Sequence, residues 1–301
     1  MGLFLFKIGI AMVKRKKNDE FYTQYCDIEK ECSNYLEHFF NKIIYCNTDT
    51  VNSNFVKYFQ NLKQQRIIKD IWYTGGLGGL DFRSQQSIDL LKHADIVVSN
   101  PPFSLFREYV SQLIKYDKKF LIIGPTNAIA YDEVFVNIKD NKLWNGTRPL
   151  GGPISMIFDV PNQMELTQSG KHYVIINGVA KAQIPSTWFT NLEHDKHRPL
   201  ILSKRYKGNE VNYPKYDNFD AININRKNNI PYDYYGVMGV PITFIDRYNP
   251  EQFKILGRDK DLTNNKKGLY INGRLLYTRI LIQRNTDTVA NDNQALTRKA
   301  A

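Results

Sequence analysis

The four residues Asn100-Pro101-Pro102-Phe103 combine groups that can hold a planar base carrying an amino group. They end the largely apolar run 95–99 and directly precede a helical pattern. Proline has no N–H to continue a ladder and keeps the preceding residue extended, so the chain leaves the sheet at a fixed angle. A side-chain amide, a rigid backbone carbonyl and an aromatic ring stand at that exit. A simple strand stop is the alternative, but the position between strand and helix favours a binding site.

These groups suit the transfer of a methyl group to the amino nitrogen of adenine. The lone pair of that nitrogen is delocalised into the ring, and two acceptors on its hydrogens can draw it out of conjugation. We expect the Asn100 side-chain oxygen and the Pro101 carbonyl to be these acceptors, with Pro102 keeping the backbone rigid and Phe103 stacking on the base. Catalysis of this kind is positioning and electrostatic fit, and a base in a duplex must first leave the stack.

The surrounding pattern predicts a doubly wound, mostly parallel α/β sheet, because apolar strands alternate with amphipathic helices. In such sheets ligands bind beyond the carboxyl ends of the strands. We therefore expect the turns after Cys46, Tyr73 and Ser99 to share one rim. The expected strands are 42–47, 66–73, 95–99 and 119–124, and the expected helices lie within 18–40 and at 54–62, 87–93, 104–116 and 131–141.

From Trp144 onward the pattern changes to strands and hairpins. We expect strands at 155–160, 173–176, 179–184 and 188–191, with Asn177-Gly178 and Asn272-Gly273 as hairpin turns. Residues 201–301 carry 17 Lys and Arg against 10 Asp and Glu. Tyrosines interleave with these cations over 206–235, which favours DNA contact over packing alone. The phosphate-binding candidates are Lys204, Arg205, Lys207, Lys215, Arg226 and Lys227.

Bulk properties restrict the possible partners and compartment. The net charge of +11 over 301 residues favours a polyanion such as nucleic acid. Three cysteines without paired metal-ligand spacing predict a reducing compartment and no metal site. The apolar segment 1–11 is too short to span a bilayer and precedes the basic cluster 14–17, which is the wrong order for a secretory signal. We expect a cytosolic protein that does not bind a membrane.

Several segments together resemble the EcoRI-type adenine-specific DNA methyltransferases, over roughly residues 18–283. They are 19–29, 81–84, 100–109, 213–217 and 236–244. The resemblance implies S-adenosylmethionine as methyl donor, double-stranded DNA as substrate and the gamma order of motifs. By position it also implies a set of cofactor-binding residues, namely Phe21, Tyr22, Thr23, Cys46, Asn47, Asp49, Asp81 and Phe82.

The resemblance also implies a division of the chain. We expect an extension and basic arm at 1–17, a catalytic domain at 18–195, a target-recognition region at 196–285 and a disordered tail at 286–301. We expect a monomer, and the resemblance allows a cognate restriction endonuclease and makes GAATTC a candidate target.

The cofactor turn departs from the usual pattern. The turn after the strand at 42–47 lacks a Gly-x-Gly fingerprint, and we interpret the glycine-rich run 75–79 as a flexible loop. Asp49 is the candidate for the ribose hydroxyls. Two other functions stay open: an amino-methyltransferase acting on rRNA or a protein glutamine, and a DNA-binding protein without activity.

Overall fold

The computed structural model describes residues 21–75, 80–150, 155–160, 172–263 and 268–285. The expected basic arm, the expected tail and most of the glycine-rich run lie outside these residues. Among the described residues no helix is long and apolar enough to cross a membrane, and no three His, Cys, Asp or Glu side chains gather to hold a metal ion.

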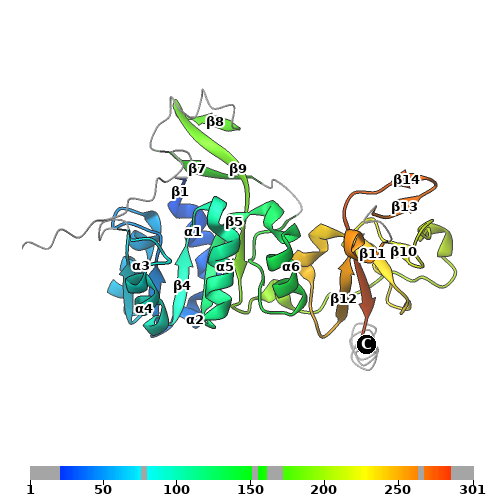
Figure 1. The fold of residues 1–301 in the computed structure, drawn as a ribbon, viewed down its shortest axis with the longest axis horizontal. Helices are drawn as coiled ribbons and strands as arrows, with labels where there is room; N and C mark the ends of the chain where they lie inside the picture. The colour runs from blue at the N-terminus through cyan, green and yellow to red at the C-terminus, as the bar shows by residue number, and fades with distance from the viewer. Residues whose placement is uncertain (1–20, 76–79, 151–154, 161–171, 264–267, 286–301) are drawn as a thin grey trace, which may run out of the picture.

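Four parallel strands, in the order β3-β2-β4-β5, form one end of a nine-stranded sheet, and Figure 1 labels β4 and β5 among them. They are β2 (Ile43–Cys46), β3 (Asp70–Tyr73), β4 (Ile96–Ser99) and β5 (Lys119–Pro125). Side chains alternate between the two faces, so Tyr45 and Val97 join one core while Ile44 and Val98 join the other. Both faces of the strands are therefore buried.

Helices cover both faces, as a doubly wound sheet requires. One face packs against α1 (Tyr25–Cys32) and α3 (Asn54–Gln64), and the other against α4 (Gln85–His93), α5 (Phe106–Lys115) and α6 (Asp132–Lys139). The prediction of an α/β sheet of this kind is confirmed for these four strands. The other strands of the same sheet pair in antiparallel fashion, so parallel pairing is confined to one end of the sheet.

The antiparallel part is built around the long strand β9 (Val179–Thr190). Its second half pairs with β5 and with β6 (Trp144–Asn145). Its first half pairs with β7 (Ser155–Asp159) and β8 (Tyr173–Ile176). The short strand β1 (Tyr22–Thr23) pairs with β7. The expected strands at 179–184 and 188–191 are thus one strand, which changes partner at Pro185.

The C-terminal region forms a four-stranded sheet in the order β10-β11-β15-β12. Its strands are β10 (Ile222–Asn223), β11 (Met238–Pro241), β12 (Phe253–Arg258) and β15 (Arg279–Arg284), with the short helix α8 (Asp259–Leu262). The hairpin of β13 (Tyr270–Ile271) and β14 (Arg274–Leu275) turns at Asn272-Gly273, and that between β8 and β9 turns at Asn177-Gly178. Both hairpin predictions are confirmed.

The two sheets share a core, because Met238, Ile255 and Ile282 pack in the same cluster as Tyr45 and Val97. Arg258 reinforces the junction. Its guanidinium lies 4.7 Å from the centre of the Phe135 ring and donates to the Ala130 carbonyl at 2.8 Å. The C-terminal sheet is therefore packed on α6 of the central layer.

Two element predictions are wrong in detail. The helix expected after a polar entry within 18–40 breaks after Cys32, where the side chain of Asn34 donates to the Lys30 and Glu31 carbonyls at 2.9 Å, and the entry contains the short strand β1. The strand expected from residue 66 begins only at Asp70. Arg66 adopts φ 60° at the end of α3, and Ile67 closes that helix by donating to the Leu62 carbonyl.

Candidate active site

Asn100 follows β4 directly and lies at the carboxyl rim of the parallel strands. Its amide nitrogen donates to the Phe21 carbonyl at 2.8 Å, across 79 residues of chain. Its amide oxygen is buried and has no hydrogen-bond partner among the described residues. A buried acceptor without a partner is unfavourable by roughly 1–3 kcal/mol, so this oxygen is held ready for a donor from a ligand.

The aromatic ring of the tetrapeptide packs against two further aromatic rings. The Phe103 ring centre lies 6.2 Å from that of Phe21 and 6.4 Å from that of Phe158, and Phe21 and Phe158 are 5.8 Å apart. Phe103 itself is half-buried in the 3₁₀ turn η2 (Phe103–Leu105) that follows the two prolines. The structure thus brings the predicted cofactor segment at Phe21 onto the predicted catalytic tetrapeptide.

A buried polar network braces the backbone of Asn100. The Ser99 hydroxyl donates to Asp49 at 2.5 Å, and the Asn100 N–H and the Ser53 hydroxyl also donate to that carboxyl group. The Thr48 hydroxyl oxygen lies 2.5 Å from that of Ser99 and 3.2 Å from the Asn100 carbonyl oxygen. Burial raises the pKa of Asp49 to about 7, although the three hydrogen bonds oppose the shift.

The carboxyl of Asp49 is therefore engaged behind the tetrapeptide, and its expected contact with a ribose stays a prediction. Gly75 packs directly against this turn. A Cβ at Gly75 would lie 2.5 Å from the Asp49 carbonyl oxygen, and the Gly75 N–H donates to the same oxygen at 2.9 Å. Glycine at 75 is thus required by close backbone approach, a different reason from the loop flexibility that the sequence suggests.

Other predicted cofactor residues divide between rim and core. Asn54 holds the Thr23 carbonyl at 2.8 Å, which fixes β1 near the turn after β2, and Tyr22 is exposed. The Cys46 thiol is fully buried, and burial raises its pKa, so only its backbone remains for a cofactor. Asn47 is also buried, and its side-chain oxygen accepts from the Tyr109 hydroxyl.

Asp81 and Phe82 lie on the α5 side of the sheet. The Phe82 ring is buried edge-on to Tyr109, with centres 5.0 Å apart, and therefore packs in the core. The Asp81 carboxyl accepts from the Arg83 guanidinium at 2.6 and 2.8 Å. Arg83 also reaches Glu108 at 3.2 Å. A role for Asp81 or Phe82 at the cofactor stays a prediction.

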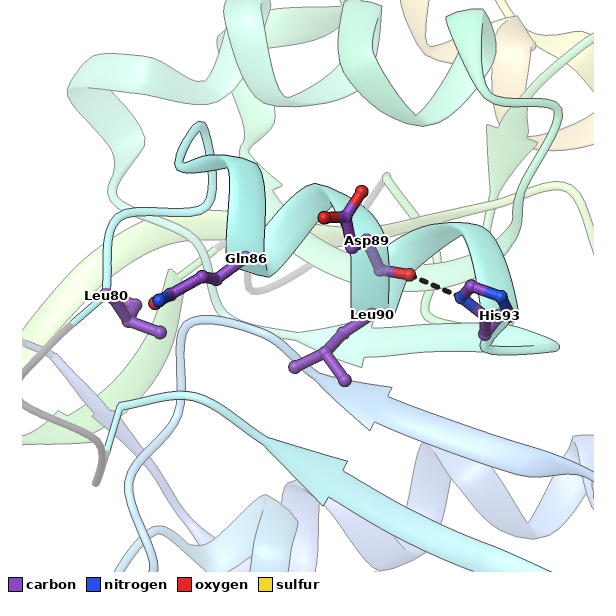
Figure 2. A pocket seen from close by; sticks show the side chains of 5 residues that line it. All are labelled: Leu80, Gln86, Asp89, Leu90 and His93. Atoms are coloured by element: carbon purple, nitrogen blue, oxygen red, sulfur yellow. Dashed lines mark hydrogen bonds between the residues drawn. The ribbon is translucent and has the colours of Figure 1, made fainter.

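An open pocket of about 580 Å³ lies along α4 (Figure 2). Its lining residues are Leu80, Gln86, Asp89, Leu90 and His93. His93 bonds to the Asp89 carbonyl of its own helix at 2.7 Å, as Figure 2 shows. None of the predicted site residues lines this pocket, so it adds nothing to the chemistry at Asn100.

The candidate DNA-binding cations all belong to the C-terminal region, and half of them already have an acidic partner. Arg205 lies 3.7 Å from Asp233, and Lys215 lies 3.4 Å from Asp220. Lys227 donates to both oxygens of the buried Asp246 at 2.7 and 2.8 Å. Three others are exposed, and no ion pair to them exists among the described residues: Lys204, Lys207 and Arg226.

The expectation that the tyrosines of this region contact DNA is wrong for two of them. Tyr213 and Tyr216 are buried, and the Tyr216 hydroxyl donates to Asn223 at 2.8 Å. Tyr206 packs between Tyr213 and Tyr234, with ring centres 5.5 and 4.6 Å away. These rings build the interior of the C-terminal unit.

The family model of the EcoRI adenine-specific methyltransferase matches residues 10–75 and 61–298 of this chain. The chain belongs to this family. The Type II methyltransferase M.EcoRI of Escherichia coli is 46% identical, over 90% of this chain and 94% of its own length. M.MgeORF184P of Mycoplasma genitalium is 38% identical, over 81% of this chain and 84% of its own, and M.MpnI of Mycoplasma pneumoniae is 36% identical, over 81% and 83%. No solved structure gives a significant match.

Sequence reasoning missed two residues that the structure places at the candidate site. Phe158 lies on β7 and reaches the tetrapeptide only because β7 pairs with β1. No local signal in the sequence marks it. Ser99 had a weak signal, since it is a small hydroxyl residue next to Asn100, whereas its partner Thr48 lies within the predicted cofactor turn.

Proposed function

We propose that this methyltransferase transfers a methyl group from S-adenosylmethionine to the N6 atom of an adenine extruded from a specific site in duplex DNA. The observation that carries the proposal is the buried, unpartnered oxygen of Asn100 beside the half-buried ring of Phe103. An acceptor and a ring in this arrangement fit an amino group on a flat base. Family membership supports adenine as that base.

Asn100 can accept from the substrate only because its amide orientation is fixed. The Phe21 carbonyl accepts from the amide nitrogen, so the amide oxygen faces the other way. That oxygen binds one amino hydrogen of adenine and the Pro101 carbonyl binds the other, which concentrates the nitrogen lone pair on one side of the ring. The hydrogen bonds from Asn100 and Ser99 to Asp49 hold the backbone in place during the reaction.

The rim also fits S-adenosylmethionine. The rim carries buried polar side-chain atoms without partners among the described residues, namely Thr23 Oγ1, Asn47 Nδ2 and Thr126 Oγ1. Thr23 lies on β1, and Asn47 and Thr126 directly follow β2 and β5. When bound, this cofactor supplies an electrophilic methyl group. The turns after β2 and β5 would bind its polar parts, and the segment 21–23 would close over them.

The basic C-terminal region supports DNA as the carrier of the adenine. The net charge of +11 favours a polyanion, and Lys204, Lys207 and Arg226 present exposed cations on that region. We assign it target recognition and assign the central sheet catalysis, with the boundary near residue 195. The adenine then reaches Asn100 by leaving the stack.

Labelled methyl transfer tests the proposal. The protein is incubated with S-adenosylmethionine carrying a labelled methyl group and, separately, with duplex DNA, rRNA and cell protein. Label in duplex DNA alone, on N6 of adenine at one sequence, is the expected result. Label in rRNA or on glutamine would replace DNA with one of those substrates. A protein that binds DNA but gives no calorimetric signal with S-adenosylmethionine would be a binder without activity.

A further inference from the structure

Strand β9 extends well beyond the rim on which Asn100 lies. The last pair between β5 and β9 joins Pro125 to Ser186, yet β9 begins at Val179. Seven residues, 179–185, therefore continue past the end of β5, a reach of roughly 20 Å at the usual strand rise. Figure 1 shows this arm of β7, β8 and β9 standing above the central sheet.

The arm is built into the candidate base site. Its strand β7 pairs with β1, with Phe158 opposite Thr23 and Asp159 opposite Tyr22. Phe158 also contacts Phe103 and Phe21, whose carbonyl orients the Asn100 amide. The arm is thus a wall of the site that continues outward, in the direction from which a large substrate must approach.

The tip of the arm is aliphatic and exposed. Residues 173–180 contain no charged side chain. Ile175 is 68% exposed, and Ile176 and Val179, on either side of the Asn177-Gly178 turn, are 37% and 38% exposed. Exposed aliphatic groups gathered at a projecting tip are typical of a contact surface rather than of a solvated loop.

We propose that the tip of the β8–β9 hairpin, Ile175 foremost, is a wedge that enters the base stack next to the extruded adenine. This inference rests on the proposed function. Aliphatic wedges between base steps are a general means of unstacking DNA, and extrusion leaves a gap that an apolar side chain can fill. The tip contacts duplex bases by apolar surface, while the cations of the C-terminal region contact phosphates.

DNA fits the tip better than a second copy of the chain does. The arm is continuous with the base site through β7 and β1, so a duplex bound at Asn100 lies beside it. Two copies, each with a net charge of +11, repel one another, whereas a polyanion is attracted.

The test compares Ile175→Ala with Val136→Ala, which alters an exposed aliphatic residue, 53%, on α6, outside the arm and outside the region assigned to target recognition. Methylation rates are measured on a fully paired duplex and on one with an abasic site opposite the target adenine, where extrusion requires little energy. We expect Ile175→Ala to slow methylation of the paired duplex about tenfold, from the apolar area lost. It should act at the wild-type rate on the abasic duplex, and Val136→Ala should match wild type on both.

Three outcomes would overturn the wedge. The first is an Ile175→Ala rate equal to wild type on the paired duplex, and the second is an equal loss on both duplexes. The third is a wild-type dimer in sedimentation that Ile175→Ala dissociates without any dependence on pairing, which would assign the tip to a second copy. If the wild type methylates neither duplex, the proposed function fails instead, so the two failures are distinguishable.

Discussion

The rim around Asn100 and the candidate DNA-binding cations of the C-terminal region differ in the partners of their polar side chains. At the rim, buried groups such as Asn100 Oδ1 and Thr23 Oγ1 lack partners among the described residues. In the C-terminal region, Lys227 and Arg205 already pair with Asp246 and Asp233. A site keeps unsatisfied groups for its ligand, whereas an ion pair within the fold serves stability first. Residue type alone therefore does not identify a functional side chain, and remaining bonding capacity at the rim is a second, independent indication.

The largest effect should come from removing the unpartnered oxygen. We expect Asn100→Ala to lower kcat for adenine methylation on the order of 10²–10³-fold, the usual loss for one preorganised hydrogen-bonding group. Affinity for S-adenosylmethionine, measured by calorimetry, should change little, because the variant leaves the turns after β2 and β5 intact. Asn100→Asp is the matched variant, since it keeps an acceptor oxygen but loses the donor to Phe21. We expect the kcat of Asn100→Asp to lie between those of the wild type and Asn100→Ala. Full turnover by Asn100→Ala would contradict the assigned role.

At Lys227, which already pairs with Asp246, we expect a loss of stability rather than of catalysis. Lys227→Ala leaves the buried Asp246 with the Leu150 N–H, at 3.3 Å, as its one remaining hydrogen-bond donor among the described residues. We expect a loss of about 1–3 kcal/mol in the free energy of unfolding, measured by urea denaturation, while the neighbouring Arg226→Ala should stay within about 0.5 kcal/mol of wild type. Unchanged stability with weaker DNA binding would return Lys227 to the phosphate-binding residues.

The same contrast explains how far the sequence could predict this molecule. The strand, two prolines and helix around Asn100 are local signals in the sequence. The observed bounds of β4 and α5 agree with the predicted bounds to within two residues. The contact between Asn100 and Phe21 joins residues 79 positions apart, and that of Phe158 depends on the pairing of β7 with β1. Composition could not show which C-terminal tyrosines are buried, because Tyr216 is buried although charged residues flank it, and Tyr235 is exposed although the apolar run 237–240 follows closely.

A smaller effect should appear in the pH dependence of stability. Burial raises the pKa of Asp49 to about 7 in the folded protein, against an ordinary value of 3.8. Between about pH 4 and 7 the folded state thus holds a proton that the unfolded chain releases, so this group lowers stability as pH rises through that window. We expect Asp49→Asn to flatten the fall in melting temperature between pH 5 and 7. Asp220→Asn, at an exposed carboxyl, should keep the wild-type slope, and an unaltered slope in Asp49→Asn would show that Asp49 is ionised throughout.

The smallest effect should come from a single exposed cation. Arg226 is exposed and has no ion pair among the described residues, so a phosphate contact would release one counterion. We expect Arg226→Ala to weaken DNA binding similarly on all sequences and to reduce the slope of log affinity against log salt by about one. Lys215→Ala, whose cation already lies 3.4 Å from Asp220, should reduce that slope less. If both variants reduce it equally, exposed ion pairs of this region open for DNA, and the contrast between free and paired cations holds only for buried partners such as Asp246.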